Sequence, residues 1–181
     1  MEELLDVLDE NGIKTGEILP RKEIHKKGLW HRVVVIAIIN EKNEILMQQR
    51  SFHKDKHAGM WDISVAGHIS TSQDAVEAAL REINEEVGIN IPYAMDMKDF
   101  RYMFSYRKEQ TFSEEYIDRQ FFDFFIFRKE DLRIEDIKVQ ESEVEQVKLV
   151  SIRELNQMLE NEEVVERDAV YRELFHYLFR V

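Results

Sequence analysis

The stretch GHISTSQDAVEAALREINEEVGI, residues 67–89, decides how the rest of this chain is interpreted. Its apolar residues recur at helical spacing and predict an amphipathic helix from about residue 74 to residue 87. Thr71 and Ser72 offer side-chain oxygens that could cap the start of this helix. Gly88 follows the last periodic residue, where a left-handed helix end favours glycine. The apolar face of the expected helix consists of Val76, Ala79, Leu80, Ile83 and Val87.

Three glutamates, Glu82, Glu85 and Glu86, occupy another face of the same helix. Their spacing places the carboxylates within roughly 100° of arc, where like charges repel. Arg81 precedes Glu85 by one helical turn and is one available partner. A divalent cation would be another, since hard ions such as Mg2+ bind oxygen ligands. The face is therefore interpreted either as a metal site or as a solvated acidic surface.

The whole stretch resembles the Nudix box, in which fixed spacings separate a glycine, a glutamate and an Arg-Glu-aliphatic-any-Glu-Glu-any-Gly-aliphatic segment. One specified position departs from the pattern, because Gln73 stands where the box has glutamate. The positions in register are Gly67, Arg81, Glu82, Ile83, Glu85, Glu86, Gly88 and Ile89.

This resemblance implies the α/β Nudix fold, a mixed β-sheet sandwiched between α-helices, and Mg2+-dependent attack of water on a diphosphate linkage. It assigns the metal ligands and catalytic carboxylates to Glu82, Glu85 and Glu86, and the orienting arginine to Arg81. Mn2+ is the alternative ion. Gln73 offers an uncharged carbonyl oxygen for coordination, which leaves the number of metal ions open.

Composition bounds the partners and the compartment. The 181 residues suit one domain over residues 1–181, and hydrophobic residues make up 44% of them. A net charge of −12 argues against nucleic acid and anionic membranes as partners. The absence of cysteine excludes disulfides and thiolate chemistry. The acidic N-terminal segment differs from a signal peptide, and we expect a cytoplasmic protein, with a homodimer left open.

Along the chain, Asn11-Gly12 predicts a hairpin at about residues 4–15. Residues 16–28 are polar and basic and are expected to cross the surface near the site. Residues 33–50 are interpreted as a second hairpin, and residues 61–69 as a short strand. Further strands are expected at 100–106, 121–128 and 144–150, with a turn at 108–115. Ser151 is expected to cap a helix ending at residue 160, and a last helix spans 168–179.

Residues 50–68, RSFHKDKHAGMWDISVAGH, are similar to the branch of Nudix proteins that contains isopentenyl diphosphate isomerase. That resemblance implies that Arg50 and Lys54 hold the substrate diphosphate, a role that suits a guanidinium fork and an ammonium group. The matching residues are Arg50, Lys54, Gly59, Trp61, Gly67 and His68, and the resemblance extends upstream through His25 and His31. We expect Trp61 to be a packing residue.

The isomerase has a catalytic cysteine where this chain has Ala66, and alanine cannot transfer a proton. It also holds a metal with three histidines and two carboxylates. The matching positions here are His25, His31, His68, Asp118 and Gln120, the last again an amide in place of a carboxylate.

The sequence thus predicts a Mg2+-dependent Nudix hydrolase acting on a small-molecule diphosphate, such as a nucleoside diphosphate derivative. The general base is one of the three helix glutamates or a later loop carboxylate, Glu141 or Glu143. Two alternatives stay open: an isomerase working without cysteine, and a non-catalytic module that senses a diphosphate metabolite.

Overall fold

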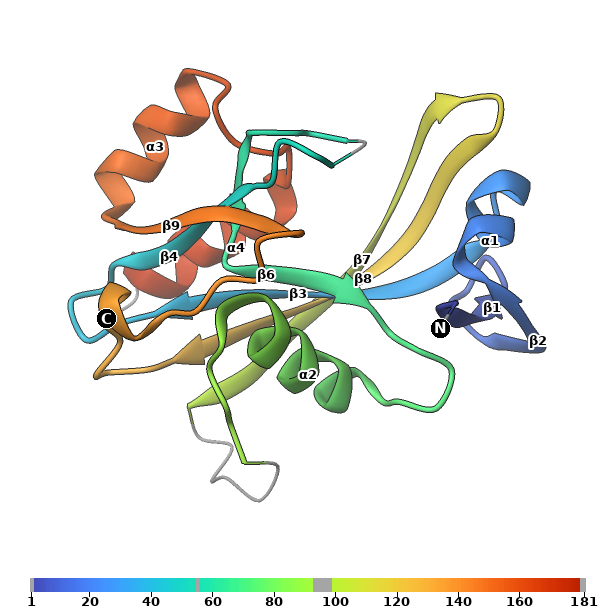
Figure 1. Cartoon of the computed structure of the whole chain (residues 1–181), viewed down its shortest axis with the longest axis horizontal. Helices are drawn as coiled ribbons and strands as arrows, with labels where there is room; N and C mark the ends of the chain where they lie inside the picture. The colour runs from blue at the N-terminus through green and yellow to red at the C-terminus, as the bar shows by residue number, and fades with distance from the viewer. Residues whose placement is uncertain (1, 55, 93–98, 180–181) are drawn as a thin grey trace.

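A mixed nine-stranded sheet forms the centre of the computed structural model, which describes residues 2–54, 56–92 and 99–179 (Figure 1). Its central strand is β3 (Trp30–Ile39). On one side β3 pairs in parallel with β8 (Tyr116–Arg128) along its whole length. On the other it pairs antiparallel with β6 (Val65–His68). The β-branched run of β3 suits a strand that is covered on both faces.

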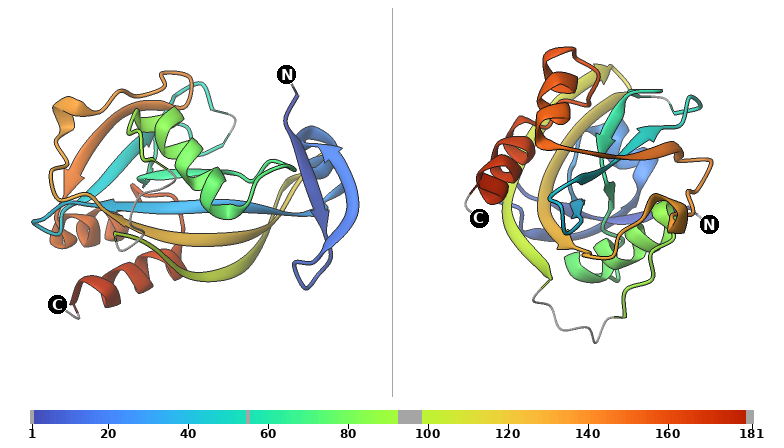
Figure 2. Two further views of the ribbon diagram at one scale, coloured as in Figure 1. Left: turned by 90° about the horizontal axis from the view of Figure 1, so that it is seen from below. Right: turned by 90° about the vertical axis from the view of Figure 1, so that its left-hand side faces the viewer.

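Alternate residues of β3 enter two separate cores. Val33, Val35, Ala37 and Ile39 pack with α3 (Ile152–Glu160) and α4 (Asp168–Phe179). Val34, Ile36 and Ile38 pack with α2 (Ala75–Val87) on the opposite face. Figure 2 shows α2 and the C-terminal helices on opposite sides of the sheet. The period of two along a strand therefore produces the predicted sheet sandwiched between helices.

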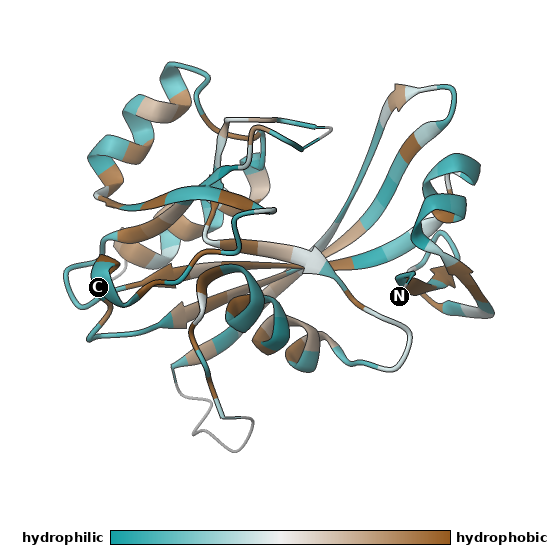
Figure 3. Ribbon diagram, viewed as in Figure 1, coloured by the Kyte–Doolittle hydropathy of each residue, from teal (hydrophilic) through white to brown (hydrophobic). Residues whose placement is uncertain are grey.

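The N-terminal hairpin expected at about residues 4–15 forms from β1 (Leu4–Leu8) and β2 (Lys14–Pro20), and its second strand extends beyond the expected bound to Pro20. Residues 16–28, which were expected to cross the surface near the site, continue β2 and then form α1 (Arg21–Lys27). Most of them are exposed, and Arg21 lines the cavity described below. Figure 3 shows that α1 is mostly hydrophilic. Only Ile24 and His25 of this helix are buried, so its sequence has no hydrophobic periodicity from which the helix could be predicted.

The two strands expected at 33–50 form, but they are a hairpin only at their turn. β4 (Ile45–Arg50) pairs with β3 only where Ile45 faces Ile39. It then diverges and pairs with β5 (Trp61–Ile63) and β9 (Val144–Val150). Ser64 lies between the diverging strands: its Oγ accepts from the Ile38 N–H at 2.8 Å and donates to the Leu46 carbonyl. The stretch expected as one strand at 61–69 is consequently divided into β5 and β6.

The helix of the motif begins at a different cap from the one predicted. Asp74, rather than Thr71 or Ser72, is the N-cap: its side chain accepts from the Glu77 N–H, and the Glu77 carboxylate accepts from the Asp74 N–H. This reciprocal pair is a capping box. Gly88 ends the helix in the left-handed conformation, with φ of 71°, as predicted.

The β7–β8 hairpin is longer than the sequence indicated. β7 (Phe100–Ser113) runs through the segment expected to be a turn, because residues 108–113 pair with the start of β8. The last strand and both C-terminal helices have the predicted bounds, with Ser151 capping α3. A 3-10 turn (Ile134–Asp136) precedes β9. In the part of the chain that the structure describes, no helix is long and apolar enough to span a membrane.

Candidate active site

A cavity of about 500 Å³ brings together residues from α2, β4, β6, the loop after β4 and the β7–β8 hairpin. The predicted site residues in its lining are Arg50, Lys54, His68, Arg81, Glu82, Glu85 and Glu86. Of the two loop carboxylates considered as a base, Glu143 is among the lining residues and Glu141 is not. Arg50 and Lys54, which are expected to hold the diphosphate and are called the clamp residues below, therefore line the same cavity as the three helix glutamates.

Glu82 and Glu86 are the buried members of the acidic face, whereas Glu85 is exposed. Burial raises the pKa of Glu82 to about 7, against the opposing charge of Arg81. Burial and the neighbouring Glu82 raise the pKa of Glu86 to about 8, although the Gln48 amide donates to Glu86 at 3.0 Å. Two buried carboxyls that resist ionisation are an arrangement that a divalent cation would stabilise.

Gly67 permits the position of Glu82. A Cβ on Gly67 would lie 2.0 Å from both Cδ and Oε1 of Glu82. The Glu82 carboxyl group therefore lies directly against the β6 backbone, and any side chain at residue 67 would displace it. The first glycine of the motif and its first helix glutamate are thus linked by contact.

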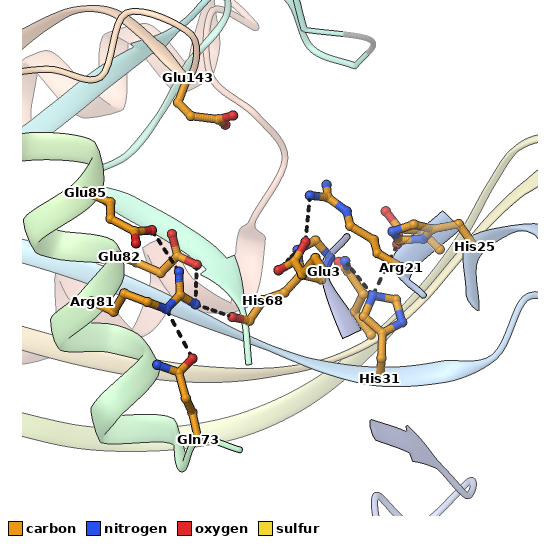
Figure 4. Close-up of polar contacts among 12 residues, drawn as sticks. Glu3, Arg21, His25, His31, His68, Gln73, Arg81, Glu82, Glu85 and Glu143 are labelled. Carbon is orange, nitrogen blue, oxygen red and sulfur yellow. Dashed lines mark hydrogen bonds and ion pairs between the residues drawn. The ribbon is translucent and has the colours of Figure 1, made fainter. Parts of the chain in front are cut away.

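Arg81 is held at four points, as Figure 4 shows. Its guanidinium donates to the Glu85 carboxylate and the His68 carbonyl oxygen, both at 2.9 Å, and lies 2.9 Å from Glu82. Its Nε donates to Gln73 Oε1 at 3.1 Å. The carbonyl of Gln73, which the sequence suggested as an uncharged metal ligand, is therefore directed at Arg81. The Gln73 amide thus helps to hold Arg81, which contacts both Glu82 and Glu85.

The two expected clamp residues already have protein partners. Arg50 donates through Nε to the Lys56 carbonyl at 3.2 Å, and its Nη1 lies 3.6 Å from the Asp62 carboxylate. Lys54 forms an ion pair with Glu143. Both side chains are mostly buried at the wall of the cavity. These contacts orient the cations.

His25, His31 and His68 come together although they lie on α1, β3 and β6. One ring nitrogen from each lies within 4.8 Å of the others, and all three residues are buried. His31 Nδ1 donates to the Leu29 carbonyl at 3.1 Å, and Gln120 donates to His31 Nε2 at 3.2 Å. Burial lowers the pKa of His31 to about 4, and also lowers that of His68, so these imidazoles are neutral.

The surroundings of the histidines fit a transition metal. Among the described residues, the buried Nε2 atoms of His25 and His68 have no hydrogen-bond partner. Asp118 Oδ1 lies 3.1 Å from His25 Nδ1, but the geometry of this contact is not that of a hydrogen bond. Asp118 Oδ1 therefore also lacks a hydrogen-bond partner among the described residues. Neutral imidazoles with an adjacent carboxylate are ordinary ligands for such ions. Asp118 and Gln120, which the resemblance groups with the histidines, lie next to them in the structure: Asp118 is beside His25, and Gln120 is beside His31.

The lining residues that the sequence analysis did not single out include Lys56, Asp62 and Arg167. The ammonium of Lys56 lies 3.1 Å from Asp118, and 3.2 and 3.6 Å from the ring centroids of Tyr116 and Phe112. Asp62 and Arg167 form a buried ion pair across 105 residues of sequence. For Asp62 the available signal was a lone charge in the segment Trp61-Asp62-Ile63, whereas Lys56 and Arg167 lie in charged stretches that give no such signal. Trp61 itself is partly buried and packs on the core, as expected.

Comparison with known proteins supports the resemblance. Nudix hydrolase 3 of Arabidopsis thaliana is 39% identical over 128 residues, which are 69% of this chain and 16% of that protein. An isopentenyl-diphosphate Delta-isomerase of Pectobacterium atrosepticum is 32% identical over 83 residues, 46% of each chain. The chain thus spans less than half of these two curated relatives.

The crystal structure of DR0079 from Deinococcus radiodurans superposes with a TM-score of 0.71 at 18% identity, covering 96% of this chain and 98% of that one. This similarity shows a shared fold. The sequence profile of the NUDIX domain matches residues 29–175. The chain therefore belongs to the NUDIX domain family, in the branch that includes both Nudix hydrolases and isopentenyl-diphosphate isomerases.

Proposed function

We propose that this protein is a Mg2+-dependent pyrophosphohydrolase that cleaves the diphosphate linkage of a small molecule, such as a nucleoside diphosphate derivative. The observation that carries the proposal is the pair of buried carboxyls, Glu82 and Glu86, in a cavity that also contains Arg50 and Lys54. Carboxylates and cations on one cavity wall match the opposite charges of a metal ion and a diphosphate.

Each group has a defined task in this proposal. Glu82, Glu85 and Glu86 would hold the ion, which supplies positive charge and lowers the pKa of an attacking water. Arg81 holds the glutamates in place, and Arg50 and Lys54 neutralise phosphate charge. The base is one of the carboxylates lining the cavity, Glu82, Glu85, Glu86 or Glu143. The histidine cluster is a separate and subordinate candidate site for a transition metal.

A screen of diphosphate compounds tests the proposal. The compounds should include nucleoside diphosphates and their sugar derivatives, each assayed with Mg2+, with Mn2+ and with EDTA. We expect phosphate-bearing products from at least one compound with metal and none with EDTA. Binding of these compounds without turnover under every metal condition would instead favour the sensor.

Removal of the clamp residues should affect binding more than chemistry. We expect Arg50→Ala and Lys54→Ala to raise KM by about tenfold and to lower kcat less, because the contacts exist in both ground and transition states. Steady-state kinetics on the hydrolysed compound measure both constants. Lys42→Ala is the matched control, since Lys42 is an exposed turn residue. A loss confined to kcat would contradict the clamp assignment.

The isomerase alternative is favoured by the histidine cluster and opposed by Ala66. We expect no conversion of isopentenyl diphosphate to its allylic isomer, with or without added transition metal, because alanine has no proton to transfer. Proton NMR in deuterated water detects both the isomer and solvent exchange. The variant Ala66→Cys with Gln120→Glu tests whether the missing groups alone account for this. Isomer formation by the unmodified protein would overturn the choice of hydrolase.

A further inference from the structure

The carboxylate of Asp62 lies between two arginines at the wall of the cavity. Asp62 is in the middle of β5 and is 0% exposed. Arg167 donates Nε to one Asp62 oxygen at 2.6 Å and Nη2 to the other at 2.9 Å. Arg50 approaches the same carboxylate only to 3.6 Å, beyond hydrogen-bond range. The bidentate partner of Asp62 is therefore Arg167, and Arg50 makes a looser ion pair.

The three groups leave one positive charge uncompensated. Guanidinium groups remain protonated in proteins, so Arg50 and Arg167 contribute two charges. Burial would raise the pKa of Asp62, but the charge and hydrogen bonds of Arg167, followed by Arg50, outweigh burial and lower it. Asp62 is thus ionised and cancels one of the two. Because Arg167 occupies both carboxylate oxygens, the remaining charge resides mainly on Arg50.

The backbone holds both arginines at Asp62. The segment carrying Arg167 is bound to β5: the Trp61 N–H donates to the Glu163 carbonyl at 3.0 Å, and the Val165 N–H to the Trp61 carbonyl at 2.8 Å. Arg50 is fixed independently by the Lys56 carbonyl. Arg167, which lies near the C-terminus, is consequently held at Asp62 by its own segment and not by the loop that carries Lys54.

We propose that Arg167 is a positioning residue for the diphosphate clamp: it neutralises Asp62, so that the guanidinium of Arg50 remains free to contact the substrate. This inference rests on the proposed function of the cavity. Without Arg167, the buried Asp62 carboxylate would keep only the Ile63 N–H at 2.8 Å and the looser ion pair with Arg50. A buried charge compensated so weakly is costly in a protein interior. Arg50 would then move the short distance needed to pair with it, and would no longer be available to phosphate.

A double-mutant cycle tests this role. We expect Arg167→Gln to raise KM for the hydrolysed compound, and the Kd for inorganic pyrophosphate, by about tenfold, with a smaller change in kcat. Adding Asp62→Asn removes the charge that captures Arg50, so Asp62→Asn with Arg167→Gln should restore both constants to within about twofold of the unchanged protein. A structural role for Arg167 predicts no such rescue. Arg172→Gln, on the exposed face of α4, is the control for loss of one positive charge.

Each outcome distinguishes between explanations. Circular dichroism establishes folding, and if Arg167→Gln does not fold, Arg167→Lys replaces it and should retain most of the affinity. An unimpaired Arg167→Gln variant, or a double variant as weak as the single one, overturns the inference. Pyrophosphate binding with rescue but without hydrolysis of any compound would overturn the proposed function and leave the clamp inference standing.

Discussion

In the Glu86→Gln variant, hydrolysis at saturating Mg2+ should fall by roughly 10³-fold, while the metal-free protein should become more stable. The first effect follows from removing a carboxylate of the proposed metal site. The second follows from the burial of Glu86, which forces a carboxyl group into a position where its charge is disfavoured. Glutamine keeps the shape and the hydrogen bond to Gln48 without that charge.

The pH dependence of this stability has a defined sign. The pKa of Glu86 is raised to about 8 from its ordinary 4.5. Between those values the folded protein keeps a proton that the unfolded chain has lost, so stability falls as pH rises. The Glu86→Gln variant lacks this contribution, and in EDTA at pH 8 we expect its melting temperature to be higher by roughly 5 °C. At pH 4 the difference should disappear.

Calorimetry in EDTA across this pH range, together with kinetics at saturating Mg2+, measures both effects. Glu160→Gln is the matched control, because Glu160 is an exposed glutamate at the end of α3. It should change neither activity nor the pH dependence. Near-normal turnover in Glu86→Gln would remove Glu86 from the proposed metal site.

The second large effect is expected from a single methyl group at Gly67. Because the added Cβ would lie 2.0 Å from the Glu82 carboxyl carbon, Gly67→Ala must displace that group. We expect activity to fall by roughly 10²-fold or more, and stability to fall by about 1–3 kcal/mol, the usual range for overpacking. Mg2+-dependent kinetics and denaturant unfolding measure the two quantities.

Glu82→Ala supplies the background that identifies the clash. With the carboxyl group gone, Gly67→Ala should cost much less stability than it does in the unchanged protein. An equal cost in both backgrounds would show that the β6 backbone, and not Glu82, is what cannot accommodate a side chain at residue 67.

Features that depend on short stretches of chain could be predicted from the sequence. The helix of the motif, its glycine end and the C-terminal helices all have their determinants within one or two turns. The cap at Asp74 was missed because three candidates, Thr71, Ser72 and Asp74, lie within four residues of one another in the loop. α1 was missed because so little of it is buried, and the length of β7 because only its pairing with β8 makes it a strand.

The sequence by itself determined the register of Gly67, Arg81, Glu82 and Glu86, since helical spacing and one strand position suffice to define it. The tertiary structure alone decided that β3 and β4 separate around Ser64, and that Asp62 meets Arg167. Contacts between residues so distant in the chain leave no periodic signal, because they depend on how the sheet and helices pack. Whether Asp62 pairs mainly with Arg167 or with Arg50 therefore depends on the folded chain and cannot be predicted from the sequence.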